Sequence, residues 1–216
     1  MQTLTEKVFL IAPPGGLFTE TVVANMFPSS TPGARRLMMH RAVASGEVLR
    51  LKRGIYLLAP PYRRSEPHPF AIAALLHPSS HISLESALAH HGLIPEAVVQ
   101  VSSVTAARSR TFATPVGVFS FDRVPATRPR SGIEATRLDR QFWAFIATPL
   151  RAIADMVYLR REVSWRTDGI AFLTESLRIE EDDLARIPMD RAAEIVQAIR
   201  NARVREYIRE LHTILS

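Results

Sequence analysis

The chain has 216 residues, 47% of them hydrophobic, which is enough to bury a sizeable core in one large domain or two small ones. It contains no cysteine, which excludes disulfides and thiolate metal sites and favours a reducing compartment. No run approaches the ~18 apolar residues of a membrane helix, and the apolar run at residues 8–12 is too short for a signal peptide. We therefore expect a cytoplasmic protein with no membrane partner.

The formal net charge of +6 is concentrated in the first third of the chain. Residues 1–64 carry nine Lys and Arg residues against three acids, whereas 18 arginines balance 18 acids in the rest. A basic segment of this kind is typical of a domain that binds a polyanion, most often nucleic acid. The alternative is a basic face that is only solvated surface.

Three helices are expected in the first 46 residues. Residues 6–11 form a short helix, and residues 18–27 form a second one with Thr19 as its possible cap. A third helix begins at Ser30 or Thr31, each a natural N-cap, and has Pro32 in its first turn. Gly46 ends it.

A hairpin follows directly, in the segment GEVLRLKRGIYLL at residues 46–58. Its turn is expected to carry Arg50, Lys52, Arg53 and Gly54. Three helices and a two-stranded hairpin are the plan of a winged helix-turn-helix domain, which we place at residues 1–60. The hairpin cations then serve as phosphate clamps, unless they only deter pairing at a sheet edge.

The third helix is the candidate for the DNA major groove. On a helical wheel its core arc holds Ala34, Leu37, Met38 and Ala42, and the opposite side holds Arg35, Arg36, Met39, His40 and Val43. Arg41 lies nearer the core arc, where we expect an internal salt bridge. An arginine fork suits guanine edges or phosphates. The predicted DNA-binding residues are Thr31, Arg35, Arg36, Met39, His40, Arg50, Lys52 and Arg53.

The remaining chain predicts a second domain of mixed α and β structure. A proline-rich linker at residues 61–69 precedes it, and the domain covers residues 70–216. Helices are expected at residues 69–77, 83–91 and 149–161, and strands in the runs at residues 97–105, 110–124 and 142–148. Helices at residues 169–177, 182–186 and 189–215 end the chain. The fold class is α+β: an N-terminal winged helix followed by a mixed α/β domain ending in helices.

The second domain contains polar residues that invite a catalytic interpretation. Adjacent His90 and His91 point in different directions on a helix, whereas a metal-binding pair needs i,i+4 spacing. No glycine elbow surrounds Ser102, Ser103 and Thr105. One of these side chains is a nucleophile, or the three belong to a polar surface that faces solvent. The acids at 180–183 suit a helix start. We therefore expect no catalytic residue, no metal and no cofactor.

Four stretches occur in this order: RRLMMHRAVASGEVLRLKRGIYLL, HISLESALAHHGLIPE, VSSVTAARSRTFATPVGVFSF and TPLRAIADMVYLR. The series, within residues 18–161, resembles AbiEi-type antitoxins of type IV toxin–antitoxin systems, a bacterial and archaeal family. The resemblance implies a winged helix that binds inverted repeats in its own promoter and represses the operon. It also implies a C-terminal domain that opposes a nucleotidyltransferase-like toxin without a stable complex. Leu150 and Arg151 depart from the family pattern, which has an acid and a lysine there.

Two functions are thus open. The first is a sequence-specific repressor of double-stranded DNA with antitoxin function. The second is a metal-dependent nuclease or nucleotidyl transfer enzyme that docks through the winged helix and uses Glu85, His91 and Asp155.

Overall fold

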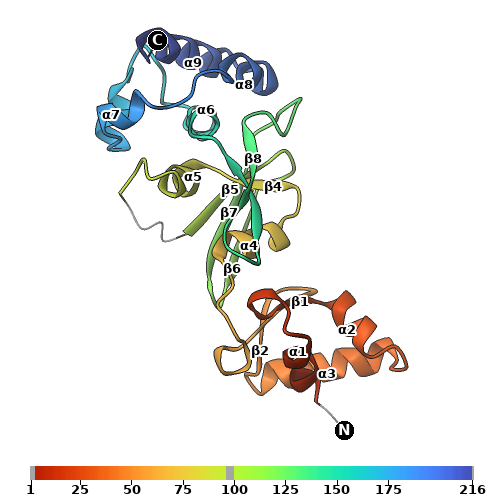
Figure 1. The fold of residues 1–216 in the computed structure, drawn as a ribbon. Helices are drawn as coiled ribbons and strands as arrows, with labels where there is room; N and C mark the ends of the chain where they lie inside the picture. The colour runs from red at the N-terminus through yellow and green to blue at the C-terminus, as the bar shows by residue number, and fades with distance from the viewer. Residues whose placement is uncertain (1–2, 96–99, 216) are drawn as a thin grey trace. The chain divides into compact units, whose positions relative to one another are not determined.

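The computed structural model describes residues 3–95 and 100–215 and contains both helices and sheets, as expected for the α+β class (Figure 1). The chain packs into two compact units. The first unit comprises the residues up to 78 together with residues 112–118 and 137–143. The second comprises residues 79–111 and 119–136 and the chain from residue 144 onward. The predicted domain limits at residues 60 and 69 stay predictions.

The first unit begins with three helices whose starts are fixed by threonine caps. The helix α1 (Leu4–Ile11) opens with a capping box, in which Thr3 Oγ1 accepts from the Glu6 amide at 3.2 Å and Glu6 Oε2 accepts from the Thr3 amide at 2.8 Å. The helix α2 (Glu20–Met26) is capped by Thr19, as predicted. The helix α3 (Pro32–Ala44) is capped by Thr31, whose Oγ1 accepts from the Ala34 amide at 3.2 Å.

A small antiparallel sheet accompanies these helices. It consists of β1 (Leu17–Thr19), β2 (Val48–Lys52) and β3 (Ile55–Leu58) in the order β1-β3-β2. The pair β2–β3 is the predicted hairpin, and β1 was not predicted. The register of β1 places Leu17 opposite Leu57 and Phe18 opposite Tyr56. The central strand β3 is therefore paired on both sides.

The core of this unit gathers residues from all three helices and from the sheet. Its members are the buried side chains Leu4, Val8, Phe18, Val23, Met39, Ala42, Val48, Tyr56 and Leu58. The rings of Phe18 and Tyr56 stack with centroids 5.7 Å apart. Burial of a large apolar side chain stabilises the fold by about 1.5–3 kcal/mol, so this cluster holds the helices on the sheet. The unit also contains short 3-10 turns at Pro14–Gly16 and Pro60–Tyr62 and the helix α4 (Pro69–Leu76).

The larger sheet has six strands in the order β6-β7-β5-β4-β9-β8. The strands are β4 (Ser80–Ile82), β5 (Gln100–Thr105), β6 (Arg110–Thr114), β7 (Gly117–Arg123), β8 (Ile133–Arg137) and β9 (Trp143–Ala147). The strand β4 pairs antiparallel with β5 and parallel with β9, where Ile82 lies opposite Ile146. The predicted run at residues 110–124 is a hairpin of two strands, and neither β4 nor β8 was predicted. Residues 97–99 of the first predicted run lie outside the described residues.

Helices complete the second unit. They are α5 (Leu84–His90), α6 (Pro149–Leu159), a π-helical turn at Phe172–Ser176, α7 (Glu181–Leu184), α8 (Ala192–Ile199) and α9 (Ala202–Leu215). The helix α6 packs against α5, α8 and α9 (Figure 1). The apolar spacing of Ile195, Ile199, Ala202, Ile208, Leu211 and Leu215 predicts a buried stripe, which is confirmed at Ile195, Ile199, Ile208 and Leu211. Ala202 is exposed and Leu215 half-buried, and Val204 and Tyr207 fill the stripe in their place. Among the described residues, no helix combines the length and the apolar character that crossing a membrane requires.

Candidate nucleic-acid interface

A groove of about 770 Å³ runs along the first unit between α2, α3 and the β2–β3 hairpin. Four cationic or titratable side chains on this groove are exposed: Arg36 and His40 from α3, Arg50 from β2, and Arg53 from the turn after β2. We call the three arginines of this set the groove cations. An acidic side chain, Glu20 at the start of α2, lines the same groove. The arrangement joins three separate segments of the basic third of the chain.

The buried face of the helix α3 differs from the predicted one. Met39 is 5% exposed and belongs to the core, whereas Leu37 is 50% exposed. Arg41, expected near the core, is exposed. The prediction that Met39 faces outward and Leu37 inward is therefore wrong. The buried arc is centred on Met39 and Ala42, because these two positions meet the side chains of α1 and β2 in the core.

Arg35 is tied into the turn that joins α2 to α3. Its Nη1 donates to the Phe27 carbonyl at 3.2 Å and also to the Ser30 carbonyl. The side chain is half-buried. Its first role is therefore to brace this turn, and the exposed arginine of the first half of α3 is Arg36. Thr31, another predicted contact, caps the helix.

The hairpin also differs from the prediction in where its cations lie. Arg50 and Lys52 are within β2, and the two-residue turn is Arg53-Gly54, with Gly54 at φ +84°. A bulge between Arg50 and Lys52 turns Leu51 into the core, where it is 4% exposed. The prediction that all three cations share the tip is wrong, and Arg53 alone of the three stands in the turn.

Lys52 is directed into its own unit. Its Nζ donates to the Leu76 carbonyl at 2.5 Å and lies 5.5 Å from the centroid of the Phe112 ring. Lys52 is not among the residues that line the groove. The bulge explains this, because it changes the side of β2 to which the residue after Leu51 points.

Glu20 is held beside the turn of the hairpin by two contacts. Its amide donates to the Gly54 carbonyl at 3.1 Å, and its Oε1 accepts from the Tyr56 hydroxyl at 3.3 Å. Burial raises the pKa of Tyr56, and the Glu20 carboxylate raises it further, so the phenol stays protonated and donates. The sequence analysis missed Glu20 as a site residue, since an acid in the first turn of a helix is common.

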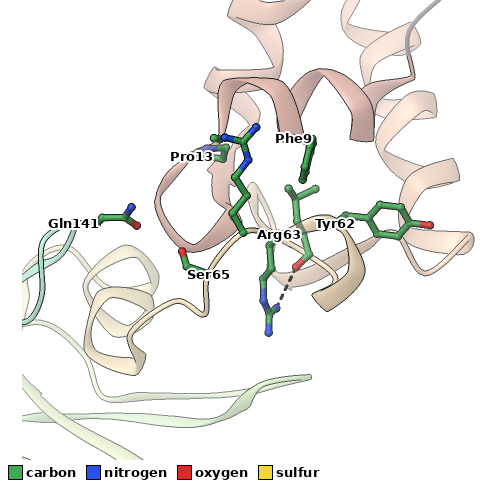
Figure 2. A pocket seen from close by; sticks show the side chains of 10 residues that line it. Phe9, Pro13, Tyr62, Arg63, Ser65 and Gln141 are labelled. Atoms are coloured by element: carbon green, nitrogen blue, oxygen red, sulfur yellow. Dashed lines mark hydrogen bonds between the residues drawn. The ribbon is translucent and has the colours of Figure 1, made fainter.

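A smaller pocket of about 150 Å³ lies between the end of α1 and the segment after β3 (Figure 2). Arg63 Nη1 donates to the Leu58 carbonyl at 3.1 Å, the contact drawn in Figure 2. Arg63 also pairs with Glu66, and the Arg64 guanidinium lies 4.9 Å from the centroid of the Phe9 ring. Both arginines of the proline-rich segment thus have partners in the first unit, which leaves the larger groove as the better place for a polyanion.

In the second unit, a buried polar network connects α6 with β4. Arg151 Nε donates to Asp155 Oδ1 at 2.9 Å, and its Nη1 donates to the Ser131 carbonyl at 2.7 Å. The other carboxylate oxygen accepts from Ser83 Oγ at 2.8 Å, and His81 Nε2 lies 3.3 Å from it. Burial is the largest single effect and alone would raise the pKa of Asp155, but the Arg151 guanidinium together with His81 and the Ser83 hydroxyl outweighs it and holds this pKa below its usual range.

The residues of the enzyme hypothesis have separate partners. Glu85 pairs with Arg160, the His91 Nε2 lies 2.9 Å from the Ala147 carbonyl, and Asp155 belongs to the network above. Across residues 3–95 and 100–215, no three His, Cys, Asp or Glu side chains come together as metal ligands would. The geometry therefore gives no support to a metal-dependent nuclease built from these three residues.

The polar residues of β5 are not the solvent-facing surface that was considered. Ser102, Ser103 and Thr105 are at most 4% exposed. The amide of Ser102 donates to Ser86 Oγ at 2.8 Å, and Thr105 Oγ1 accepts from the Ala107 amide at 3.1 Å. The Ser102 amide therefore ties β5 to α5, and the Thr105 hydroxyl stabilises the turn that follows β5.

No family model matches the chain, and no curated protein matches it either. The residues of the groove and the four sequence stretches therefore carry the information about function.

Proposed function

We propose that the first unit is a winged-helix module that binds double-stranded DNA, with α3 as the recognition helix and the β2–β3 hairpin as the wing. The observation that carries this proposal is the set of groove cations, Arg36, Arg50 and Arg53, exposed with His40 along one groove. Each lies in the third of the chain that holds the whole net charge of +6. Cations gathered on one face from separate segments are the electrostatic footprint of a nucleic-acid site.

The proposed contacts divide between base reading and positioning. The major groove is about 12 Å wide and admits an α-helix, so Arg36 and His40, one turn apart on α3, would approach base edges. The planar fork of Arg36 matches the O6 and N7 acceptors of guanine. Arg50 and Arg53 on the wing would contact phosphates, which fix the register without reading sequence.

We further propose that the chain is an autoregulatory repressor and the antitoxin of a type IV system. The support is the series of four stretches that resemble AbiEi-type antitoxins. The departure at Leu150 and Arg151 lies inside the fold, since each residue is 1% exposed. It therefore changes the interior around α6 and no exposed residue, because residues 150–157 of this helix are all buried.

The test is binding of the purified protein to DNA from its own upstream region, compared with a random duplex of equal length, at two salt concentrations. We expect selective binding that weakens steeply with salt, because each neutralised phosphate releases counterions. Arg36→Ala should reduce affinity for the specific site by about 1–3 kcal/mol if this arginine reads a base.

Arg41→Ala is the matched control, since Arg41 is exposed on the same helix but does not line the groove. It should change affinity less than about twofold, within the range of weak surface effects. Equal and weak binding to both duplexes, or equal losses from Arg36→Ala and Arg41→Ala, would contradict the proposal.

A further inference from the structure

Glu20 is an exposed carboxylate on a groove whose other charged side chains are cationic. It comes from α2, while Arg36 and His40 come from α3 and Arg50 and Arg53 come from the hairpin. Its position is fixed, because its amide is bound to Gly54 and its Oε1 accepts from Tyr56. The carboxylate is thus held on the groove beside the turn of the proposed wing.

An acid at this position opposes binding to the DNA backbone. A phosphate that binds the groove cations enters the groove that Glu20 also lines, where the two negative charges repel each other. A groove that only needed to hold phosphates would gain affinity from a neutral residue here. Glu20 therefore fits a groove that selects among DNA sequences at some expense of general affinity.

Few groups on DNA can compensate an ionised carboxylate. It accepts hydrogen bonds and donates none, and phosphate and carbonyl oxygens are acceptors too. In the major groove the donors on base edges are the exocyclic amino groups, N4 of cytosine and N6 of adenine. A base that presents such a group gains a hydrogen bond, while any other base leaves the carboxylate repelled and unpaired.

Resting on the DNA-binding function proposed above, we propose that Glu20 is a specificity-determining residue that accepts a hydrogen bond from an exocyclic amino group of one base, cytosine first. Tyr56 is its positioning residue, since the phenol hydrogen bond holds the carboxylate in one orientation. Arg36 and Glu20 then read complementary features, guanine acceptors and an amino donor, from different helices.

The experiment is selection of binding sites from a random duplex library by the full chain and by two variants. Glu20→Gln keeps the shape of the side chain and retains an amide oxygen that can accept from Tyr56. Glu66→Gln is the matched control, because this substitution removes the same charge at a position outside the groove. The Glu66 side chain is 75% exposed. Thermal unfolding of each variant checks that it is folded.

We expect the wild type and Glu66→Gln to enrich the same site. Glu20→Gln should lose the preference for cytosine at one position and should bind random duplex about 3- to 10-fold more tightly at low salt, because one repulsive charge is gone. Loss of an adenine preference instead would assign the amino group to that base. Tyr56→Phe should weaken the same base preference without changing the salt dependence.

Two outcomes would overturn the inference in distinguishable ways. If the wild type selects a site and Glu20→Gln selects it with the same preference at every position, Glu20 does not determine specificity, and the proposed function stands. If the wild type enriches no sequence and binds no duplex, the DNA-binding function itself fails.

Discussion

Replacing Arg151 by Met should destabilise the chain far more than replacing any exposed arginine. Arg151 is 1% exposed and its partner Asp155 is fully buried. The substitution removes the 2.9 Å bond to Asp155 and the 2.7 Å bond to the Ser131 carbonyl, while a methionine fills much of the same space. The buried carboxylate is left without its cation.

The expected loss follows from that uncompensated charge. Removing one partner of a buried ion pair destabilises a protein by about 3–5 kcal/mol. The double variant R151M/D155L should lose much less than Arg151→Met alone, because it removes both charges together. The difference between the single and double variants measures the coupling of the pair.

Urea unfolding at pH 7 is the assay, and Arg160→Met is the control. Arg160 pairs with Glu85, but both side chains are about one-third exposed, at 36% and 32%. Such a pair is worth about 0–1 kcal/mol. A loss for Arg151→Met no larger than that for Arg160→Met would refute the argument from burial.

The Arg151–Asp155 pair also predicts how the destabilisation by Arg151→Met depends on pH. The pKa of Asp155 in the folded wild type lies below its unfolded value, so the pair stabilises the fold above the unfolded pKa of about 3.9. This stabilisation is lost as the pH falls through the folded pKa. Without Arg151 the largest effect that lowers this pKa is gone while burial remains, so the folded pKa rises and the destabilisation by Arg151→Met should shrink between pH 7 and pH 4. A constant difference over this range would contradict the expected charge state.

Three further predictions concern other parts of the chain. Met39→Ala should destabilise the fold by about 2–5 kcal/mol in urea unfolding. Leu37→Ala, on the exposed side of α3, should change the stability by less than about 0.5 kcal/mol. Equal effects of the two substitutions would mean that the buried face of α3 is not centred on Met39. Gly132→Ala should destabilise by about 2 kcal/mol or more, because the residue has φ +69° and a Cβ there would lie 2.8 Å from two side chains. Gly92→Ala, at φ +73° with no atom within 4 Å of the added Cβ, should lose clearly less, and a larger loss there would contradict the role of packing. Arg53→Gln should lower the slope of log affinity against log salt by about 1, and an unchanged slope would remove Arg53 from the phosphate contacts.

The sequence predicted best those elements that local signals determine. Thr19 is a candidate cap from the sequence, Thr31 is one of two candidates beside Ser30, and both threonines are caps, because a cap depends on a few adjacent residues. The hairpin was recognised from its two apolar runs. The i,i+4 spacing of Arg151 and Asp155 was also visible in the sequence, although nothing local indicated that both would be buried.

Features that depend on distant segments were not predictable in this way. Residues 37–39 of α3 are three apolar residues in a row, so helical periodicity cannot decide which of them faces the core. Met39 is the buried one because α1 and β2 pack against it. The strand β1 has only three residues and forms because β3 is there to pair with it. The bulge that redirects Lys52 likewise depends on the register with β3.

The strand order β1-β3-β2 has a consequence for synthesis on the ribosome. The strand β1 pairs with residues 55–57, so the small sheet cannot close until the chain has emerged as far as β3. Until then Leu17 and Phe18, which are at most 8% exposed in the finished fold, have no strand to cover them. Helices α2 and α3 form from local contacts and can fold first, and the hairpin then closes the sheet in one late step. Nascent chains arrested before Ile55 leaves the exit tunnel should therefore be helical but open to proteases, and chains arrested well beyond Leu58 should resist them.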